Sequence, residues 1–526
     1  MELDVFRLIE DMADYSRFVL YGCGEIAKKT YNYLKKMNYI PEYCVITLES
    51  SEEKFFEDDI PIYGIENCVN KIVNEKIMLL LAVNESNAKE IMSILKKYNI
   101  KNHIAIMDYI IDRHSFFKQY LNMSIEEYTE KTAKWRINSH VSLSANVSDE
   151  VKNIKKYINH LKTNKKKIVF GLGLLAPRVI KIAKALIGSG YKIEMIAEPG
   201  AIIQDICLGE LQKLGINLVY AYCIEDFTYK VLSEEPALVH LFTQRGQSDF
   251  DRILFNIKDI LPPIIFDQYD IVGNFYTNVS EETIYNEKYC LEHADAICNR
   301  GAEIDYLKEK QNYQIVNPVL HLPDYCGERF FNSEQGDGVL SICYSGIVIP
   351  SRNYPEFWES VRELAKRCKE NSCHFHVYPT TWNEDLYKDY IELSGKNSYF
   401  HFHKTISYEI LSREISRYDY GVFPILKPFI EKGWIYNTKE KLIYGTTNKY
   451  FDYIEAGLPV ISAVPKYAFD FLRKKGIMLD WTIEDYNFNE LRIKKSELKE
   501  RVIAEREKLK MSNHIYKLIE LYDAIT

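Results

Sequence analysis

Short apolar runs alternate with amphipathic stretches along most of the chain, and glycine often stands where one gives way to the other. Near the N-terminus, the apolar run 18–21 precedes a glycine pair and a stretch with helical periodicity. Further apolar runs at 44–47, 77–83 and 103–107 predict more strands, with a helix between the last two. We therefore expect an α/β domain over residues 1–112.

The first glycine turn has the spacing of a dinucleotide fingerprint. Gly22, Gly24 and Ala27 occupy its three small positions, which permit a tight turn, close approach of a phosphate and packing of helix on strand. Glu49 is the nearest candidate for the acid that holds a ribose. Two interpretations stay open, a scaffold domain and a nucleotide-binding domain.

Residues 113–166 are polar, helical in pattern and free of glycine and proline. We interpret them as a helical connector. Its end carries a basic cluster, which is either a solvated helix face or a contact for anionic lipid headgroups or an acidic acceptor. The cluster consists of Lys152, Lys155, Lys156, Lys162, Lys165, Lys166 and Lys167.

A second α/β unit is expected over residues 167–336. Its first strand, 168–170, is predicted to enter a turn at Gly171 and Gly173, followed by a helix to about residue 186 and a strand at 192–196. His240 follows one later apolar run, and the next run precedes a group of polar side chains. Ligands gather at the carboxyl ends of such strands, so these are candidate site residues. The group is Asp267, Tyr269 and Asp270.

A third unit, residues 337–526, begins after the acidic, glycine-bearing segment NSEQGDG. Its first strand leads to Ser345 and Gly346, where a missing side chain lets backbone approach a phosphate. Arg352 is the nearest basic residue able to hold that phosphate. His374 and His376 fall in a predicted strand, and Lys404 follows a later one as a candidate contact to a donor substrate.

The stretch TTNKYFDYIEAGLPVISAV, residues 446–464, predicts a short helix over 448–456, a stop at Gly457 and a strand over 460–464. The start of a helix favours a phosphate, and Lys449 adds a full charge there. Asp452 lies about 6 Å further along the axis, the right distance for a ribose hydroxyl pair. The candidate donor-binding residues here are Thr447, Asn448, Lys449 and Asp452.

Composition narrows the class of protein. A hydrophobic content of 47% with 27% charged residues is typical of a globular protein of several domains. The net charge of −8 argues against general nucleic-acid binding. The acidic N-terminus and the lack of a long apolar segment predict a cytoplasmic protein, and the basic cluster leaves open a peripheral contact at the inner membrane face. Eleven cysteines without a C-x-x-C pair predict reduced thiols and no metal site.

The 446–464 stretch closely resembles the donor-site signature N-K-x-x-[DE]-Y followed by A-G-x-P-V-I of family 4-like glycosyltransferases with the GT-B fold. His240 and the Asp267–Asp270 turn resemble that family's D-x-x-H and Y-D-x-H-D patterns, although Ala237 and Tyr269 depart from them. The resemblance implies two Rossmann-like halves facing a cleft, an acceptor half at 167–336 and a donor half at 337–526. It covers about 350 residues.

The resemblance implies a retaining, metal-independent transfer of a hexosyl group from a nucleoside-diphosphate sugar to a glycan, lipid-linked or protein acceptor, with no tightly bound cofactor. It implies catalytic roles for His240, Arg352 and Lys449. It also implies donor contacts from Gly171, Gly173, Ser345, Gly346 and Lys404, beside those of the 448–456 helix, and acceptor-side roles for Asp267, Tyr269 and Asp270. Two alternatives remain: a non-catalytic protein that binds nucleotide sugars, and an NAD-dependent sugar-nucleotide oxidoreductase.

Overall fold

The computed structural model describes residues 2–36, 39–47, 55–111, 120–121, 123–138, 146–160, 166–221, 223–244, 248–328, 330–331, 338–406, 408–434 and 436–526. They form two compact units, Met1–Asn159 with Tyr222–Lys230, and His160–Ala221 with Val231–Thr526. Within the described part of the chain, none of the helices is both long and apolar enough to cross a membrane.

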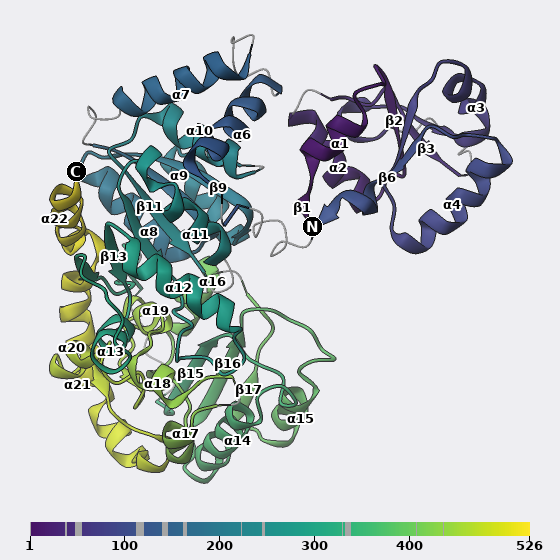
Figure 1. Cartoon of the computed structure of the whole chain (residues 1–526). Helices are drawn as coiled ribbons and strands as arrows, with labels where there is room; N and C mark the ends of the chain where they lie inside the picture. Colours follow the sequence, from purple (N-terminus) through teal and green to yellow (C-terminus); the bar gives the residue numbers. More distant parts are fainter. Residues whose placement is uncertain are drawn as a thin grey trace. The chain divides into compact units, whose positions relative to one another are not determined.

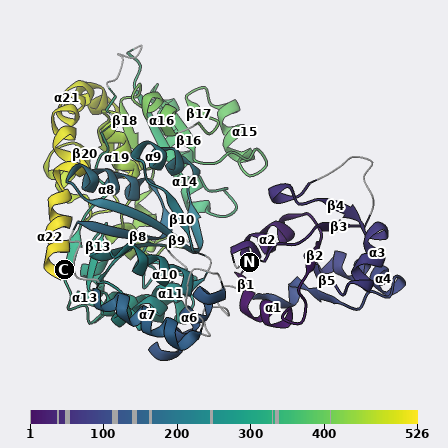
Figure 2. The same ribbon diagram turned by 90° about the horizontal axis from the view of Figure 1, so that it is seen from above.

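The first unit contains a parallel sheet with the strand order β4-β3-β2-β5-β6. Side chains alternate between its faces, so one face packs on α1 and α2 and the other on α3 and α4 (Figure 2). The strands are β2 (Phe18–Tyr21), β3 (Cys44–Ile46), β4 (Ile62–Gly64), β5 (Met78–Leu81) and β6 (His103–Ala105), with β1 (Glu2–Leu3) and β7 (Ile110–Ile111) as a separate antiparallel pair. The helices are α1 (Val5–Asp11), α2 (Glu25–Lys36), α3 (Ile65–Asn74) and α4 (Glu85–Lys97).

The predicted glycine turn follows β2. Gly22 has a φ of +112°, and a Cβ there would lie 2.8 Å from Cγ1 of Val83 and 2.9 Å from the carbonyl oxygen of Ala82. A pocket of about 520 Å³ opens beside it, at the carboxyl ends of β2 and β5, where the strand order reverses. Glu49, the predicted ribose acid, lies outside the described residues.

We expect Gly22→Ala to destabilise the first unit by roughly 1–3 kcal/mol, because the new methyl group meets backbone and the φ is left-handed. Gly24→Ala is the matched control, since its Cβ would meet nothing within 4 Å. Denaturant unfolding of the full chain, followed by circular dichroism, measures both. Equal stability of the two variants would contradict the steric role assigned to Gly22.

The predicted connector contains two helices, α6 (Ile125–Asn138) and α7 (Val147–His160), which pack with the start of α10 (Ile224–Glu234). Arg136 of α6 forms an ion pair of 2.7 Å with Glu150 of α7, and both side chains are buried. In the basic cluster, Lys152, Lys155 and Lys156 are exposed, whereas Lys162 and Lys165 lie outside the described residues. The membrane contact stays a prediction.

The second unit contains two parallel sheets, in agreement with two Rossmann-like halves (Figure 1). The first has the order β10-β9-β8-β11-β12-β13-β14. Its strands are β8 (Lys167–Leu175), β9 (Lys192–Ile203), β10 (Leu218–Tyr220), β11 (Leu238–Thr243), β12 (Ile264–Gln268), β13 (Ala296–Asn299) and β14 (Val319–His321). Its helices are α8 (Pro177–Gly188), α9 (Asp205–Leu214), α11 (Ser248–Asn256), α12 (Glu281–His293) and α13 (Glu303–Lys310).

The second sheet has the order β17-β16-β15-β18-β19-β20. Its strands are β15 (Ser341–Gly346), β16 (His374–Pro379), β17 (Phe400–Phe402), β18 (Tyr420–Val422), β19 (Val460–Ile461) and β20 (Met478–Leu479). Its helices are α14 (Pro355–Glu370), α15 (Lys388–Lys396), α16 (Tyr408–Ile415), α17 (Lys427–Lys432), α18 (Lys439–Tyr444), α19 (Lys449–Glu455), α20 (Asp470–Lys474) and α21 (Phe488–Arg506). The boundary predicted near residue 337 lies outside the described residues.

The predicted turn at Gly171 and Gly173 is wrong. Both glycines lie inside β8, which pairs with β9 as far as Leu175 and Ile203, with an irregularity after Leu172. The apolar side chains on both sides of each glycine are buried in the sheet, which favours continuing the strand over turning. The helix begins only at Pro177, where proline suits the first turn.

One apolar core joins the two halves. It extends from Phe170 and Leu186 of the first sheet to Phe451 and Leu458 of the second, and it includes Tyr522. Tyr522 belongs to α22 (Ile515–Ile525), which follows α21 back to the first half (Figure 1). The fold class predicted from the sequence, α/β with a small domain before two Rossmann-like halves, is confirmed.

Candidate active site

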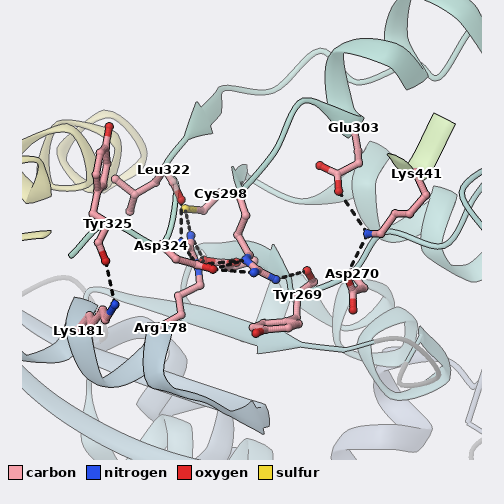
Figure 3. A network of polar contacts seen from close by, with 12 residues as sticks. Arg178, Lys181, Tyr269, Asp270, Cys298, Glu303, Leu322, Asp324, Tyr325 and Lys441 are labelled. Atoms are coloured by element: carbon pink, nitrogen blue, oxygen red, sulfur yellow. Dashed lines mark hydrogen bonds and ion pairs between the residues drawn. The ribbon is translucent and has the colours of Figure 1, made fainter. Parts of the chain in front are cut away.

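Lys441 links the two halves near the carboxyl ends of their strands. Its ammonium, on α18, lies 2.9 Å from Oδ1 of Asp270 and 3.5 Å from Oε1 of Glu303, both in the first half (Figure 3). Burial alone would lower the pKa of Lys441, but the charge of Asp270, helped by Glu303, raises it above its ordinary value. Lys441 is therefore a fixed cation that holds the Asp270 turn against α18.

Behind that turn lies a buried network of two arginines and two aspartates (Figure 3). Arg178 of α8 donates to Oδ2 of Asp267 at 2.9 Å and to Oδ1 of Asp324 at 3.1 Å. Arg300 donates hydrogen bonds of 2.6–3.1 Å to both carboxylate oxygens of Asp324. Burial would raise the pKa of Asp267, but Arg178, with a neighbouring histidine, lowers it to about 2. Asp267 is thus a charged member of this network and not an exposed contact for an acceptor.

His240, a predicted catalytic residue, lies inside β11 and has 0% of its surface exposed. Its Nδ1 is 2.7 Å from the hydroxyl of Tyr522, and its Nε2 is 3.4 Å from Oδ2 of Asp267. The ring stacks on Phe242, and burial lowers its pKa below the ordinary value. The expectation that His240 follows its strand is wrong, because the strand continues to Thr243.

The turn 269–270 is held in place by Glu287 of α12, which the sequence analysis missed. Its carboxylate accepts hydrogen bonds from the backbone N–H groups of Val272 and Gly273, each at 2.7 Å, and from Nε2 of Gln268 at 2.5 Å. Burial raises the pKa of Glu287 to about 7, although these donors oppose the rise. Glu287 lies in the middle of α12, and the residues around it in the sequence do not indicate which turn it supports.

Tyr269 faces the second half across the cleft. Its ring lies 3.8 Å from the guanidinium carbon of Arg300, which also donates to its carbonyl oxygen at 2.7 Å. Burial raises the pKa of Tyr269 to about 12, against the influence of Arg300, and the negative charge of Asp452 adds to the rise. The predicted acceptor-side residue Tyr269 and the predicted donor residue Asp452 are therefore electrostatic neighbours.

Lys449 and Gly346 meet in the second half. Gly346 ends β15 with a φ of +143°, and a Cβ there would lie 2.9 Å from Cε of Lys449. The ammonium lies 3.3 Å from the hydroxyl of Tyr344 and within 5 Å of the rings of Tyr344 and Phe423. In the described part of the chain, no carboxylate comes within ion-pair distance of it. Burial lowers the pKa of Lys449 to about 8, partly countered by Asp452.

The helix α19, which carries Lys449 and Asp452, makes hydrogen bonds to both halves. α19 begins after Asn448, whose side chain makes no capping bond to the described residues, and it ends at Glu455. Glu455 accepts from Lys181 of α8 at 2.8 Å, and Tyr453 accepts from the N–H of Ser345 at 2.9 Å. Asn448, Asp452 and the preceding Thr447 are partly exposed, and Gly457 takes the predicted left-handed conformation.

The remaining predicted residues are not brought to this point. Arg352 is exposed in the turn after Pro350. Lys404 is also exposed, 5.9 Å from the ring of Trp382. Gly171 lies within β8, paired to Ile196 and Leu241, and Gly173 lies two residues further along that strand. Their proposed contacts stay predictions.

A pocket of about 680 Å³ is lined by both halves. Backbone hydrogen bonds from Thr277 to Tyr436, at 3.2 Å, and from Thr438 to Phe275, at 3.1 Å, join the two halves next to its lining residues. Tyr276 also lies 5.2 Å from the ammonium of Lys441, so the pocket adjoins the ion pairs that join the halves. Its lining includes Tyr276, Ser280, Thr283, Ile349, Asn353 and Tyr436.

Arg178, Arg300 and Lys441 were also missed from the sequence. The sequence does contain a signal for Arg178. It lies on the same face of α8 as the apolar residues Ile182 and Leu186, so the pattern predicts that Arg178 is buried. An arginine at such a position requires buried anionic partners. Nothing in the sequence around Lys441 indicates its partners, which are 138 and 171 residues away.

Fold and site together define an α/β protein with two Rossmann-like halves and a cation-bearing cleft between them. No protein-family model and no curated protein sequence matches the chain. Solved structures of similar fold include a glycosyltransferase from Rickettsia africae, with 12% identity and a TM-score of 0.48, over 69% of this chain and 99% of that one.

Two further structures are similar. The lipopolysaccharide outer core galactosyltransferase WaaB has 11% identity and a TM-score of 0.45, over 68% of this chain and 99% of its own. A mutant of the O-GlcNAc transferase of Thermobaculum terrenum has 10% identity and a TM-score of 0.44, over 76% of this chain and 78% of its own. The functional proposal below rests on the geometry of the cleft.

Proposed function

We propose that the protein is a glycosyltransferase that takes a hexose from a nucleoside-diphosphate sugar. The observation that carries this proposal is the half-buried Lys449, whose ammonium packs against Gly346 at the carboxyl edge of a parallel sheet and whose charge is only partly offset by Asp452. A cation that is partly removed from water and only partly balanced by a carboxylate is unfavourable, and an anionic ligand relieves that penalty. A diphosphate fits beside it because Gly346 presents backbone without a side chain.

Asp452 extends this site toward a nucleoside. It lies one turn of α19 beyond Lys449, and a partly exposed carboxylate is suited to accept hydrogen bonds from ribose hydroxyls. A diphosphate and a ribose hydroxyl pair recur in UDP-, GDP- and ADP-sugars, so in this proposal Lys449 and Asp452 recognise that class and leave the identity of the sugar to the pocket. The pocket of about 680 Å³ beside Lys441 is the proposed place for the sugar and its glycan, lipid-linked or protein acceptor.

The proposed chemistry follows from where charge develops. Breaking the bond between sugar and phosphate increases negative charge on the diphosphate, and a cation already aimed at that position stabilises the transition state more than the ground state. In this proposal, Lys449 supplies that charge, the departing diphosphate helps to deprotonate the acceptor, and the anomeric configuration is retained without a catalytic metal or a tightly bound cofactor.

The test is a thermal-unfolding screen of the full chain against UDP-, GDP-, ADP- and TDP-sugars, with NADH as a further ligand. We expect one nucleotide sugar to stabilise the protein by about 2.7 kcal/mol at a hundred times its dissociation constant. Lys449→Met should lose most of this effect, whereas Lys366→Met, at an exposed lysine of α14 that has no proposed contact to the donor, serves as the matched control. Stabilisation by none of the sugars, or equal stabilisation of both variants, would overturn the proposal.

The same samples separate the alternatives. A transferase releases the free nucleoside diphosphate when an acceptor is added, and slowly by hydrolysis without one. A non-catalytic protein that binds nucleotide sugars shows the stabilisation but no release. Stabilisation by NADH alone would favour an oxidoreductase built on the Gly22 pocket.

A further inference from the structure

Three histidines lie on two neighbouring strands at the edge of the second sheet, and a fourth, His403, follows directly after β17. β16 and β17 are parallel, and His376 stands opposite His401 in their register. Because side chains alternate along a strand, His374, His376, His401 and His403 share one face. The residues between them, such as Phe375 and Phe400, point to the other face and join its apolar core.

The imidazoles are in direct contact. Nδ1 of His374 lies 2.7 Å from Nε2 of His401, and Nδ1 of His376 lies 2.9 Å from Nε2 of His403. The rings of His376 and His401 stack with their centres 4.4 Å apart. One ring nitrogen from each of His374, His376 and His401 lies within 4.8 Å of the other two.

We propose that His374, His376 and His401 bind one divalent transition-metal ion of the zinc, cobalt or nickel class. Imidazole nitrogen is a preferred ligand of these ions. The metal replaces the proton in the hydrogen bond between His374 and His401. That proton moves to the other ring nitrogen of the donating histidine, so both imidazoles remain neutral.

The fit requires the ring nitrogens to move. The nitrogen of His376, within 4.8 Å of the other two, must come to about 3.3 Å from them. Two metal–nitrogen bonds of about 2.0–2.1 Å in tetrahedral geometry place their nitrogens about 3.3 Å apart, so the present 2.7 Å between His374 and His401 must widen by about 0.6 Å. β17 is the edge strand of the sheet and can make this shift. All three ligands are partly exposed, which leaves a path for the ion and room for water as a fourth ligand.

His403 has a supporting place in this site. Its contact at Nδ1 of His376 orients that ring and leaves Nε2 of His376 for the ion, as the outer hydrogen bond of a metal-bound histidine commonly does. His403 itself is packed between this contact and the ring of Tyr378, with which it stacks at 4.2 Å. It is therefore a positioning residue of the proposed site.

The site is separate from the proposed reaction. His376 stands three residues before the end of β16, whose last residue, Pro379, pairs with Gly346. A metal there joins β17 to β16 just before the exposed Lys404 and contacts no residue of the Lys449 site. Its binding is therefore independent of whether the protein transfers a sugar.

The experiment uses the full chain without a histidine tag, freed of metal by a chelator and titrated with cobalt(II) chloride and zinc chloride. We expect one cobalt ion per chain, with d–d absorption typical of nitrogen ligands and no sulfur-to-cobalt charge-transfer band. Zinc should displace the cobalt and raise the midpoint of thermal unfolding.

Three variants and a control assign the ligands. His374→Gln and His401→Gln should each weaken cobalt binding by about 100-fold, and His403→Gln by about 10-fold, as expected for a positioning residue. His293→Gln, at an exposed histidine of α12, should bind as the parent does. Absence of stoichiometric binding, a thiolate absorption band, or full binding by the two ligand variants would each overturn the proposal. The parent protein's spectrum decides the ligand type even where a variant fails to fold.

Discussion

Lys449→Met is expected to lower the turnover of sugar transfer by about 100- to 1,000-fold, the effect of removing one preorganised group that stabilises developing negative charge. Folding should be preserved, because methionine fills the space between Tyr344 and Phe423 and removes a half-buried charge that Asp452 balances only in part. Steady-state kinetics with the nucleotide sugar found in the screen, and thermal unfolding of both proteins, measure the two effects.

Asp452→Ala is the comparison variant for this prediction. It should weaken nucleotide binding by about tenfold through the loss of charge-assisted bonds to ribose, with a smaller effect on turnover. The parent and Lys449→Met should also differ in pH dependence. The pKa of Lys449 is about 8, so the parent's affinity for a nucleoside diphosphate should fall as the pH rises through 8, when the ammonium loses its proton. A parent and variant with the same turnover and the same pH profile would remove Lys449 from the mechanism.

Arg178→Met should destabilise the second unit by about 3–5 kcal/mol, because it leaves Asp267 and Asp324 as buried carboxylates without one of their cations. Lys184→Met is the matched control on the same helix. Its ion pair to Glu328, at 2.6 Å, is half exposed and should contribute less than about 1 kcal/mol. Denaturant unfolding at neutral pH compares the two.

The pH dependence of stability gives a second measure of the same network. The folded-state pKa of Asp267, about 2, lies below its ordinary value of 3.8. Its stabilising contribution is therefore complete above pH 3.8 and is lost as the pH falls toward 2. In Arg178→Met this pKa should rise, so acid should cease to destabilise the variant in that window. If the parent and Arg178→Met lose the same stability as the pH falls from 3.8 toward 2, Arg178 is not the main partner of Asp267.

The sequence predicted those features that depend on local pattern. The apolar run before Gly22, the helix that stops at Gly457 and the alternation of strands with helices each follow from neighbouring residues. Gly346 and Lys449 were each predicted from the sequence to contact a phosphate, and the structure places them side by side. Short-range physics was enough for these features.

Long-range pairing explains what the sequence did not reveal. The length of β8 depends on its partner β9, and the burial of His240 depends on Tyr522, which follows it by 282 residues. Glu287 holds a turn that lies 14 to 19 residues before it, with no periodicity to indicate the connection. Local propensity cannot predict such partners, because the contact between them exists only after the chain has folded.

The bond between His240 and Tyr522 has a consequence for the order of events during synthesis. The first Rossmann-like half leaves the ribosome long before Tyr522, and Lys181 likewise waits for Glu455, 274 residues later. Until then the hydroxyl group that contacts His240 and the carboxylate that pairs with Lys181 are missing, so the half is incomplete while it is being translated. Contacts of such wide sequence separation form slowly, and a nascent chain in this state is a natural client for chaperones.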